Sequence, residues 1–315
     1  MIGRDEILRV ANTLGLEPRV VEKDYVLGWV LHGIARDPVL GGSWVFKGGT
    51  CLKKCYFETY RFSEDLDFTV TDSAQLSEEF LLERFRAIGA QLYDETGIEL
   101  PAELLRFKIW PGKYGKPAGE GRVSYRGPIA PRGGDLPRIK IDLTADEILV
   151  LPPVIRSASH AYSDLPADGM AVRCYAFEEV FGEKVRALGE RARPRDLYDV
   201  VNLFRNGEFQ AAAGVIRDVL RQKCAFKSIR IPTFEALGGF AKSSMANGAI
   251  CSATSFHRCR QWNPSGTRCP NSSPGWAARS RRWRSARIRL PPAIRYCAAR
   301  PAPSGSRGGS RPRSR

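Results

Sequence analysis

The sequence predicts an α+β fold in which a mixed sheet with flanking helices precedes a helical C-terminal region. Short apolar or alternating runs between glycines and prolines are typical of strands, and they occupy 44–46, 65–70, 104–110, 121–125, 138–143, 149–153 and 172–175. Longer segments with apolar residues every three or four positions predict helices at 4–14, 18–36, 77–95, 177–193, 194–205 and 208–223. All of the strand signals precede residue 177, so we expect a sheet domain with N-terminal helices at 1–176 and a helical region at 177–240.

The second N-terminal helix carries a charged interruption. Its apolar stripe is broken by Glu22-Lys23-Asp24-Tyr25. From periodicity alone, this stretch forms a charged outer face of the helix, and it gives no role to its individual residues.

A glycine turn follows the first strand. Gly48 and Gly49 end the apolar run at 44–46, and a short helix is expected after them. Glycines allow the backbone to approach a ligand closely, and a helix N-terminus offers free N–H groups to phosphate. Lys47 and Thr50 add a positive charge and a hydroxyl. We therefore expect these four residues to bind the phosphates of a nucleotide.

Two carboxylates share one face of the next strand. Because side chains alternate along a strand, Asp65 and Asp67 point the same way, while Leu66 and Phe68 point into a core. Neighbouring carboxylates repel each other unless water or a cation neutralises them, and Mg²⁺ is the usual cation for oxygen ligands. Alone, an Asp-x-Asp pair equally fits a solvated edge strand. The glycine turn, one short helix upstream, favours a metal site for nucleotidyl transfer.

The residues around these two features resemble a known family. Gly48-Gly49-Thr50, followed by Arg61-Phe62-Ser63-Glu64-Asp65-Leu66-Asp67, is similar to the AbiEii/AbiGii toxin family. Its members are nucleotidyltransferases of the DNA polymerase beta superfamily and form the toxin half of type IV toxin–antitoxin systems. The resemblance implies a polymerase-beta-type palm, adds Ser63 to the expected nucleotide-binding residues, and includes the Glu22-Lys23-Asp24-Tyr25 stretch as a recurring family feature.

A palm of this type needs a third carboxylate on a neighbouring strand. In 138–144 the two isoleucines and Leu143 take one face, and the polar residues, among them Lys140 and Asp142, take the other. Alternation alone equally describes a half-exposed strand. Together with the Asp65/Asp67 pair, the pattern favours Asp142 as the third metal ligand, with Lys140 as a partner of Asp142 or of phosphate.

The helices after residue 177 carry further charged residues. Lys184 and Arg191 lie two turns apart on one face, Arg195 follows at the helix junction, and Asp196 and Asp199 are three residues apart. Either the cations clamp a triphosphate and the acids orient them, or the helices carry only surface salt bridges. Glu-Lys-x-x-Ala-Leu-x-x-Arg, followed by Arg-Asp-x-Tyr-Asp, resembles the C-terminal motifs of the toxin family, in which a lysine and a downstream aspartate are needed for activity. Lys184 and Asp199 match best, with Asp196 as the alternative acid.

The resemblance covers about 15–206 and implies a metal-dependent nucleotidyltransferase. It implies transfer of a nucleotide from an NTP to an RNA acceptor, the tRNA 3′ end, with Mg²⁺ (or Mn²⁺) as cofactor and a separately encoded antitoxin as partner. Two alternatives stay open. The first keeps the chemistry but uses a small-molecule acceptor such as an aminoglycoside. The second is a non-catalytic protein that binds nucleic acid through a basic tail.

The basic charge of the chain is concentrated at its C-terminus. Residues 241–315 hold sixteen basic residues, fifteen of them arginine, and no acidic residue, so the formal net charge of +15 leaves −1 for the first 240 residues. This tail fits a disordered basic arm for phosphate binding, or translation of a shifted reading frame in a GC-rich gene. Its Arg/Pro/Ser/Gly-rich composition and lost apolar periodicity favour the second interpretation.

The remaining composition bears on location and cysteine chemistry. Neither a signal peptide nor a membrane span is recognisable, so the sequence predicts a cytoplasmic protein without a membrane partner. The eight cysteines include no C-x-x-C pair, and only three histidines accompany them. This pattern favours reduced structural thiols over a zinc site.

Overall fold

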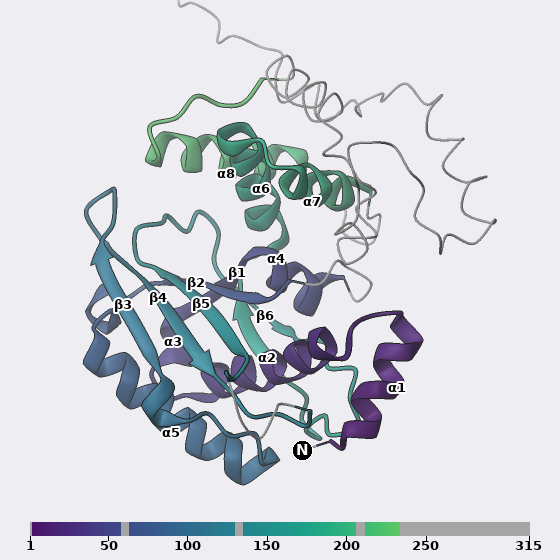
Figure 1. The fold of residues 1–315 in the computed structure, drawn as a ribbon. Helices are drawn as coiled ribbons and strands as arrows, with labels where there is room; N and C mark the ends of the chain where they lie inside the picture. Colours follow the sequence, from purple (N-terminus) through teal and green to yellow (C-terminus); the bar gives the residue numbers. More distant parts are fainter. Residues whose placement is uncertain (1, 58–62, 130–134, 206–211, 234–315) are drawn as a thin grey trace, which may run out of the picture.

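The computed structural model describes residues 2–57, 63–129, 135–205 and 212–233, and the predictions for 241–315 lie outside these ranges. Its centre is a seven-stranded mixed sheet with the order β3-β4-β5-β2-β1-β7-β6 (Figure 1). The strands are β1 (Trp44–Lys47), β2 (Asp65–Val70), β3 (Arg106–Pro111), β4 (Pro117–Ser124), β5 (Arg138–Thr144), β6 (Val154–Ser157) and β7 (Ala171–Cys174). The predicted fold class, a mixed sheet with flanking helices, is confirmed.

Helices precede, cover and follow the sheet. Three come before β1: α1 (Arg4–Leu14), α2 (Pro18–Arg36) and α3 (Leu40–Ser43). Between strands lie α4 (Gly48–Cys51), the π-helical η1 (Leu52–Tyr56), the 3-10 turns η2 (Ser73–Gln75) and η3 (Ala102–Leu104), and α5 (Glu78–Thr96), which Ser77 caps by accepting a hydrogen bond from the Phe80 N–H. After β7 come α6 (Phe177–Arg191), α7 (Pro194–Arg205) and α8 (Ala213–Phe226), which lie together beyond one end of the sheet (Figure 1).

One face of the sheet forms the core with α2 and α5. Phe85 of α5 packs against Trp44 of β1 and Phe107 of β3, with ring centroids 6.3 and 4.9 Å apart. Leu66 and Phe68, which alternate with the two aspartates of β2, are buried on this face as predicted. Each such side chain contributes about 1.5–3 kcal/mol when it leaves water, so this face fixes the orientation of the strands. On the opposite face, β2 and β5 carry polar residues, among them Asp65, Asp67 and Asp142.

Two predicted strand positions differ from the structure. The strand expected at 149–153 is wrong, because β6 begins at Val154 after two prolines that lack N–H donors. The N–H groups of Val150 and Leu151 instead bond the carboxylate of Glu179 at 3.2 and 2.9 Å. The strand expected at 121–125 begins earlier than predicted, because β4 starts at Pro117. Strand pairing with β3 extends through these residues.

Among the described residues, no helix combines the length and the hydropathy that crossing a bilayer requires.

Candidate active site

Strand register brings the three predicted carboxylates to the polar face of the sheet. β2 and β5 are parallel, so that Asp67 lies directly beside Asp142, and Asp65 lies beside Lys140. On the other side, antiparallel β1 sets Lys47 beside Asp67. These side chains are half-buried, whereas the alternate residues of both strands are buried in the core. The structure therefore brings Asp65, Asp67 and Asp142 together as the sequence predicted.

The glycine turn packs directly on one of these carboxylates. Gly48 has a φ of 81°, which L side chains rarely adopt, and a Cβ built on it would lie 2.1 Å from Oδ2 of Asp67. Gly49 is buried at the start of α4. Thr50 is fully buried, and its hydroxyl donates to the main-chain carbonyl of Asp65 at 2.5 Å. The Thr50 hydroxyl thus fixes the start of β2, while Ser63 lies half-buried just before that strand.

The environment disfavours ionisation of the carboxylates. Burial raises the pKa of Asp67 to about 6; the positive charges of Lys47 and Lys184 oppose this shift, and the negative charges of Asp142 and Asp65 add to it. Burial also raises the pKa of Asp65, against the opposing charge of Lys23. Lys47 and Lys184 come from β1 and α6, so the sheet and the helical region both direct positive charge at Asp67.

These residues suit a hard divalent cation. Their donors are all carboxylate oxygens on adjacent strands, and a cation would relieve their mutual repulsion. In the structure Lys140 Nζ lies 2.7 Å from Oδ2 of Asp142, and its positive charge partly offsets the repulsion between the carboxylates. Within the described parts of the chain, the oxygens of the three aspartates do not all lie within 4.8 Å of one another. Ligation of one ion by all three would therefore require side-chain rotation.

The two candidate acids of α7 have different partners. Lys184 Nζ lies 2.7 Å from Oδ2 of Asp199, and the aspartate is fully buried. Arg191 Nε and Nη2 each lie 2.8 Å from the carboxylate oxygens of Asp196, which is also fully buried. Arg195 is exposed at the start of α7. Both acids orient cations of α6, but only the Asp199 pair includes a lysine whose charge acts on Asp67.

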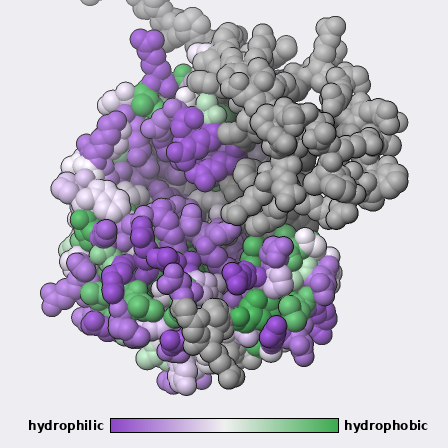
Figure 2. Space-filling model, in the orientation of Figure 1, coloured by the Kyte–Doolittle hydropathy of each residue, from purple (hydrophilic) through white to green (hydrophobic). Residues whose placement is uncertain are grey.

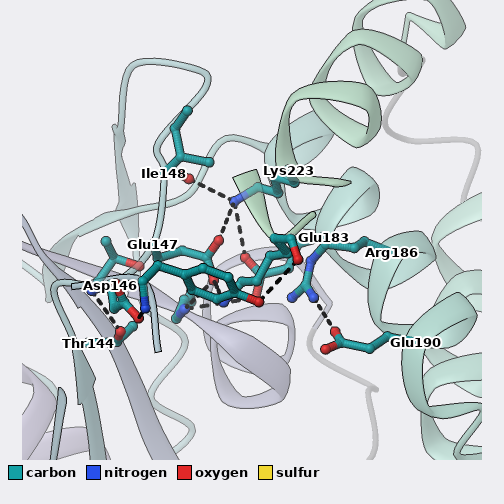
Figure 3. A network of polar contacts seen from close by, with 12 residues as sticks. Thr144, Asp146, Glu147, Ile148, Glu183, Arg186, Glu190 and Lys223 are labelled. Carbon is teal, nitrogen blue, oxygen red and sulfur yellow. Dashed lines mark hydrogen bonds and ion pairs between the residues drawn. The ribbon is translucent and has the colours of Figure 1, made fainter. Parts of the chain in front are cut away.

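A buried ionic cluster, which the sequence did not predict, joins the helical region to the sheet. Lys223 of α8 is fully buried, and its Nζ lies 2.8 Å from Oε1 of Glu179 and 3.3 Å from Oε2 of Glu183. Figure 3 shows Lys223 pointing toward Glu183 and Ile148. Lys223 also donates to the carbonyl of Ile148 at 3.0 Å. Glu183 in turn lies 3.9 Å from Nζ of Lys47. The cluster therefore links α8 to the cation beside Asp67.

The charged stretch of α2 also connects separate elements, so its prediction as an outer face is wrong. Glu22 accepts the N–H of Ile129 at 2.6 Å, and Lys23 pairs with Glu64 at 2.9 Å. Asp24 is buried and binds Lys54 at 2.9 Å as well as Lys53, both from η1. The Tyr25 hydroxyl donates to Asp164 at 2.6 Å. The four side chains thus fasten α2 to the segment after β4, the residue before β2, η1 and the segment between β6 and β7.

Glu120 is a further polar residue that sequence reasoning missed. It lies beside Asp142 in the register of β4 and β5, and its carboxylate is 3.4 Å from Lys140. The sequence shows no sign of this position, because the strand that it predicts begins only at residue 121. The cluster around Lys223 cannot be recognised from any one stretch of sequence, because its members come from α6, α8 and the segment after β5.

The surface of the molecule is polar near these residues. Figure 2 shows hydrophilic residues across the middle of the face seen in Figure 1, between the sheet and the helical region.

Comparison with curated proteins found no match. Among solved structures, the nucleotidyltransferase toxin MenT4 from Mycobacterium tuberculosis H37Rv is 22% identical, with 70% of this chain and 69% of that chain covered and a TM-score of 0.46. An antigenic nucleotidyltransferase-like protein from Paracoccidioides brasiliensis is 14% identical, covering 75% and 94%, with a TM-score of 0.29. The antibiotic-resistance factor ANT(2'')-Ia is 14% identical, covering 72% and 95%, with a TM-score of 0.27.

The family comparison is more extensive. The model of the AbiEii family, described as nucleotidyl transferase AbiEii toxin of a Type IV TA system, matches residues 29–281. That range contains the glycine turn, all three aspartates and the Lys184–Asp199 pair. The chain belongs to the AbiEii family of nucleotidyltransferase toxins from type IV toxin–antitoxin systems.

Proposed function

We propose that this toxin transfers a nucleotide from an NTP to an RNA acceptor, with Asp65, Asp67 and Asp142 as ligands of Mg²⁺ or Mn²⁺. The observation that carries the proposal is the register of Asp67 with Asp142, together with the charges of Lys47 and Lys184 that act on Asp67. A bound divalent ion would neutralise phosphate charge and lower the pKa of an acceptor hydroxyl.

The protein residues have separate roles in this proposal. The turn at Gly48 and Gly49 brings main-chain N–H groups to the triphosphate, close to the Asp67 carboxylate. Lys184, oriented by Asp199, offsets the negative charge that develops as the acceptor oxygen attacks the α-phosphate and pyrophosphate leaves. Arg191, oriented by Asp196, and the exposed Arg195 are the proposed contacts for the outer phosphates. Lys47 supports Asp67 from β1, and Ser63 borders the site.

The RNA acceptor is supported by basic residues beside the carboxylates. In the register of the sheet, Arg106, Arg122 and Lys140 form a row that ends at Asp65. Lys108 and Arg138 project from the same face, and four of these five side chains are exposed. Such a row of cations suits a polyanion, whose phosphates it would hold while one end reaches the metal site. The tRNA 3′ end fits this requirement.

A small-molecule acceptor is the alternative, and an acceptor screen separates the two. Full-length protein would be incubated with labelled NTP and either total tRNA or a panel of aminoglycosides. We expect label on RNA, a rate that falls steeply with salt, and a raised KM for RNA in Arg122→Gln. Transfer to an aminoglycoside, unaffected by Arg122→Gln, would contradict the RNA proposal but leave the nucleotidyltransferase intact.

The family also implies a separately encoded antitoxin. We propose that the antitoxin counters the consequence of RNA modification. Co-expression with its partner gene would test this proposal by restoring growth, whereas continued growth arrest would contradict it.

A further inference from the structure

Three cysteines from separate elements meet in the protein interior. Cys51 ends α4, Cys55 lies in η1, and Cys174 ends β7, where its neighbour in register is Phe46 of β1. Their Sγ atoms all lie within 4.8 Å of one another. All three are buried, with exposed fractions of 0%, 5% and 0%. In the described residues, no other group of three or more histidine, cysteine or acidic side chains is so compact.

The spacing of these sulfurs is close to that of a three-coordinate metal site. Metal–sulfur bonds of about 2.3 Å in a trigonal plane put the sulfurs about 4.0 Å apart. Contraction by less than about 1 Å would therefore bring the thiols to a common ion. The π-helical η1, which carries Cys55, is a form of helix that is rare and frequent at functional sites.

A cationic side chain lies next to the three cysteines. The Arg156 guanidinium lies 4.5 Å from the ring centre of Tyr56, and its Nε donates to the Cys55 carbonyl at 2.8 Å. A cation is thus held beside the sulfurs, where it offsets the negative charge of a metal–thiolate group.

We propose that Cys51, Cys55 and Cys174 form a three-thiolate site for a soft monovalent metal ion of the Cu(I) class. Thiolates select soft ions, and a structural zinc site would need a fourth ligand, which no described histidine, cysteine or acidic residue supplies. Each thiol that binds as thiolate releases one proton to solvent. The bound ion would tie α4, which begins at Gly48, to β7 and so hold the turn that packs on Asp67.

The test is an anaerobic titration with the Cu(I)–bicinchoninate complex. The parent protein is the full chain in which the four tail cysteines are changed to serine (Cys251, Cys259, Cys269 and Cys297). We expect the parent to withdraw one equivalent of Cu(I), to gain thiolate-to-metal absorption in the near ultraviolet, and to melt at a higher temperature. X-ray absorption should report three sulfur neighbours and no nitrogen or oxygen.

Matched variants locate the ion. Cys174→Ser and Cys51→Ser should each weaken Cu(I) binding by tenfold or more, whereas Cys224→Ser, which removes a buried thiol of α8, should retain it. Because the X-ray signature is measured on the parent, it decides the outcome even where a variant fails to fold. No withdrawal of Cu(I) by the parent, equal withdrawal by all three variants, or preferential retention of Zn²⁺ in a matched competition would overturn the proposal.

Discussion

Asp67 of β2 and Asp142 of β5 are direct neighbours in register across a parallel strand pair, on the face opposite the core. Strand pairing holds two carboxylates beside each other with only partial compensation from Lys47 and Lys184. A divalent cation bound here, as proposed, would relieve this repulsion and so link occupancy of the site to stability of the fold.

Mg²⁺ should therefore raise the melting temperature of the native protein but not that of Asp142→Asn. Without Mg²⁺, the variant should be about as stable as the native protein, because it loses both the repulsion from Asp67 and the ion pair with Lys140. Glu120→Gln is the matched control, since Glu120 lies beside Asp142 but is not a proposed ligand. Calorimetry with and without Mg²⁺ makes the comparison. An equal Mg²⁺ response in native protein and Asp142→Asn would contradict the metal assignment.

Gly48→Ala should reduce both stability and activity. The new methyl group would collide with the Asp67 carboxylate, and a left-handed φ costs a non-glycine residue about 1–2 kcal/mol. We expect a loss of about 1–3 kcal/mol in urea unfolding and a larger loss of nucleotide transfer, because Asp67 is displaced. Gly42→Ala is the control, since its Cβ would meet nothing within 4 Å. Similar activities of the two variants would show that the close approach at Gly48 has no role.

The two acids of α7 can be separated by substitution. Each replacement breaks a buried ion pair, so Asp199→Asn and Asp196→Asn should each cost about 3–5 kcal/mol of stability. Their effects on activity should differ, because only Lys184, the partner of Asp199, acts on the charge of Asp67. Transfer rates per folded molecule should fall by at least tenfold more in Asp199→Asn. The reverse order would assign the catalytic pair to Arg191 and Asp196.

The buried pair of lysines on η1 gives a pH dependence. Burial, with the neighbouring charge of Lys54, lowers the pKa of Lys53 to about 8, although Asp24 opposes the shift. Between this value and the ordinary 10.5, the unfolded chain binds more protons than the folded one, so this contribution to stability rises with pH. From pH 7.5 to 9.5 the native protein should gain about 1–2 kcal/mol relative to Lys53→Met. Urea unfolding at both pH values measures the difference, and parallel pH profiles would refute the assignment.

Local sequence patterns predicted the features that depend on one strand or one turn. Alternation along β2 and β5 gave the orientation of Asp65, Asp67 and Asp142, and the glycine pair marked the turn. Those patterns also predicted that Phe68 faces the core. Each of these inferences needs only the two-residue period of a strand or the backbone freedom of glycine.

Contacts that depend on tertiary packing were not predictable in this way. The sequence around Lys223 predicts a helix and nothing more. The residue is buried among glutamates only because α8 packs against α6. Cys174 follows Cys51 by more than a hundred residues and meets it only because β7 pairs with β1. Asp24 likewise contacts Lys53 and Lys54 only because the fold brings α2 next to η1.

In the proposed function, Asp67 supports metal-dependent nucleotidyl transfer to RNA. The most direct measurement incubates full-length native protein and Asp67→Asn with Mg²⁺, total tRNA and each α-³²P-labelled NTP in turn. We predict that the native protein labels RNA from a preferred NTP, that removal of Mg²⁺ by chelation stops the labelling, and that Asp67→Asn lowers it by at least a hundredfold. Equal labelling by both proteins, or RNA binding without any labelling by either, would contradict this account.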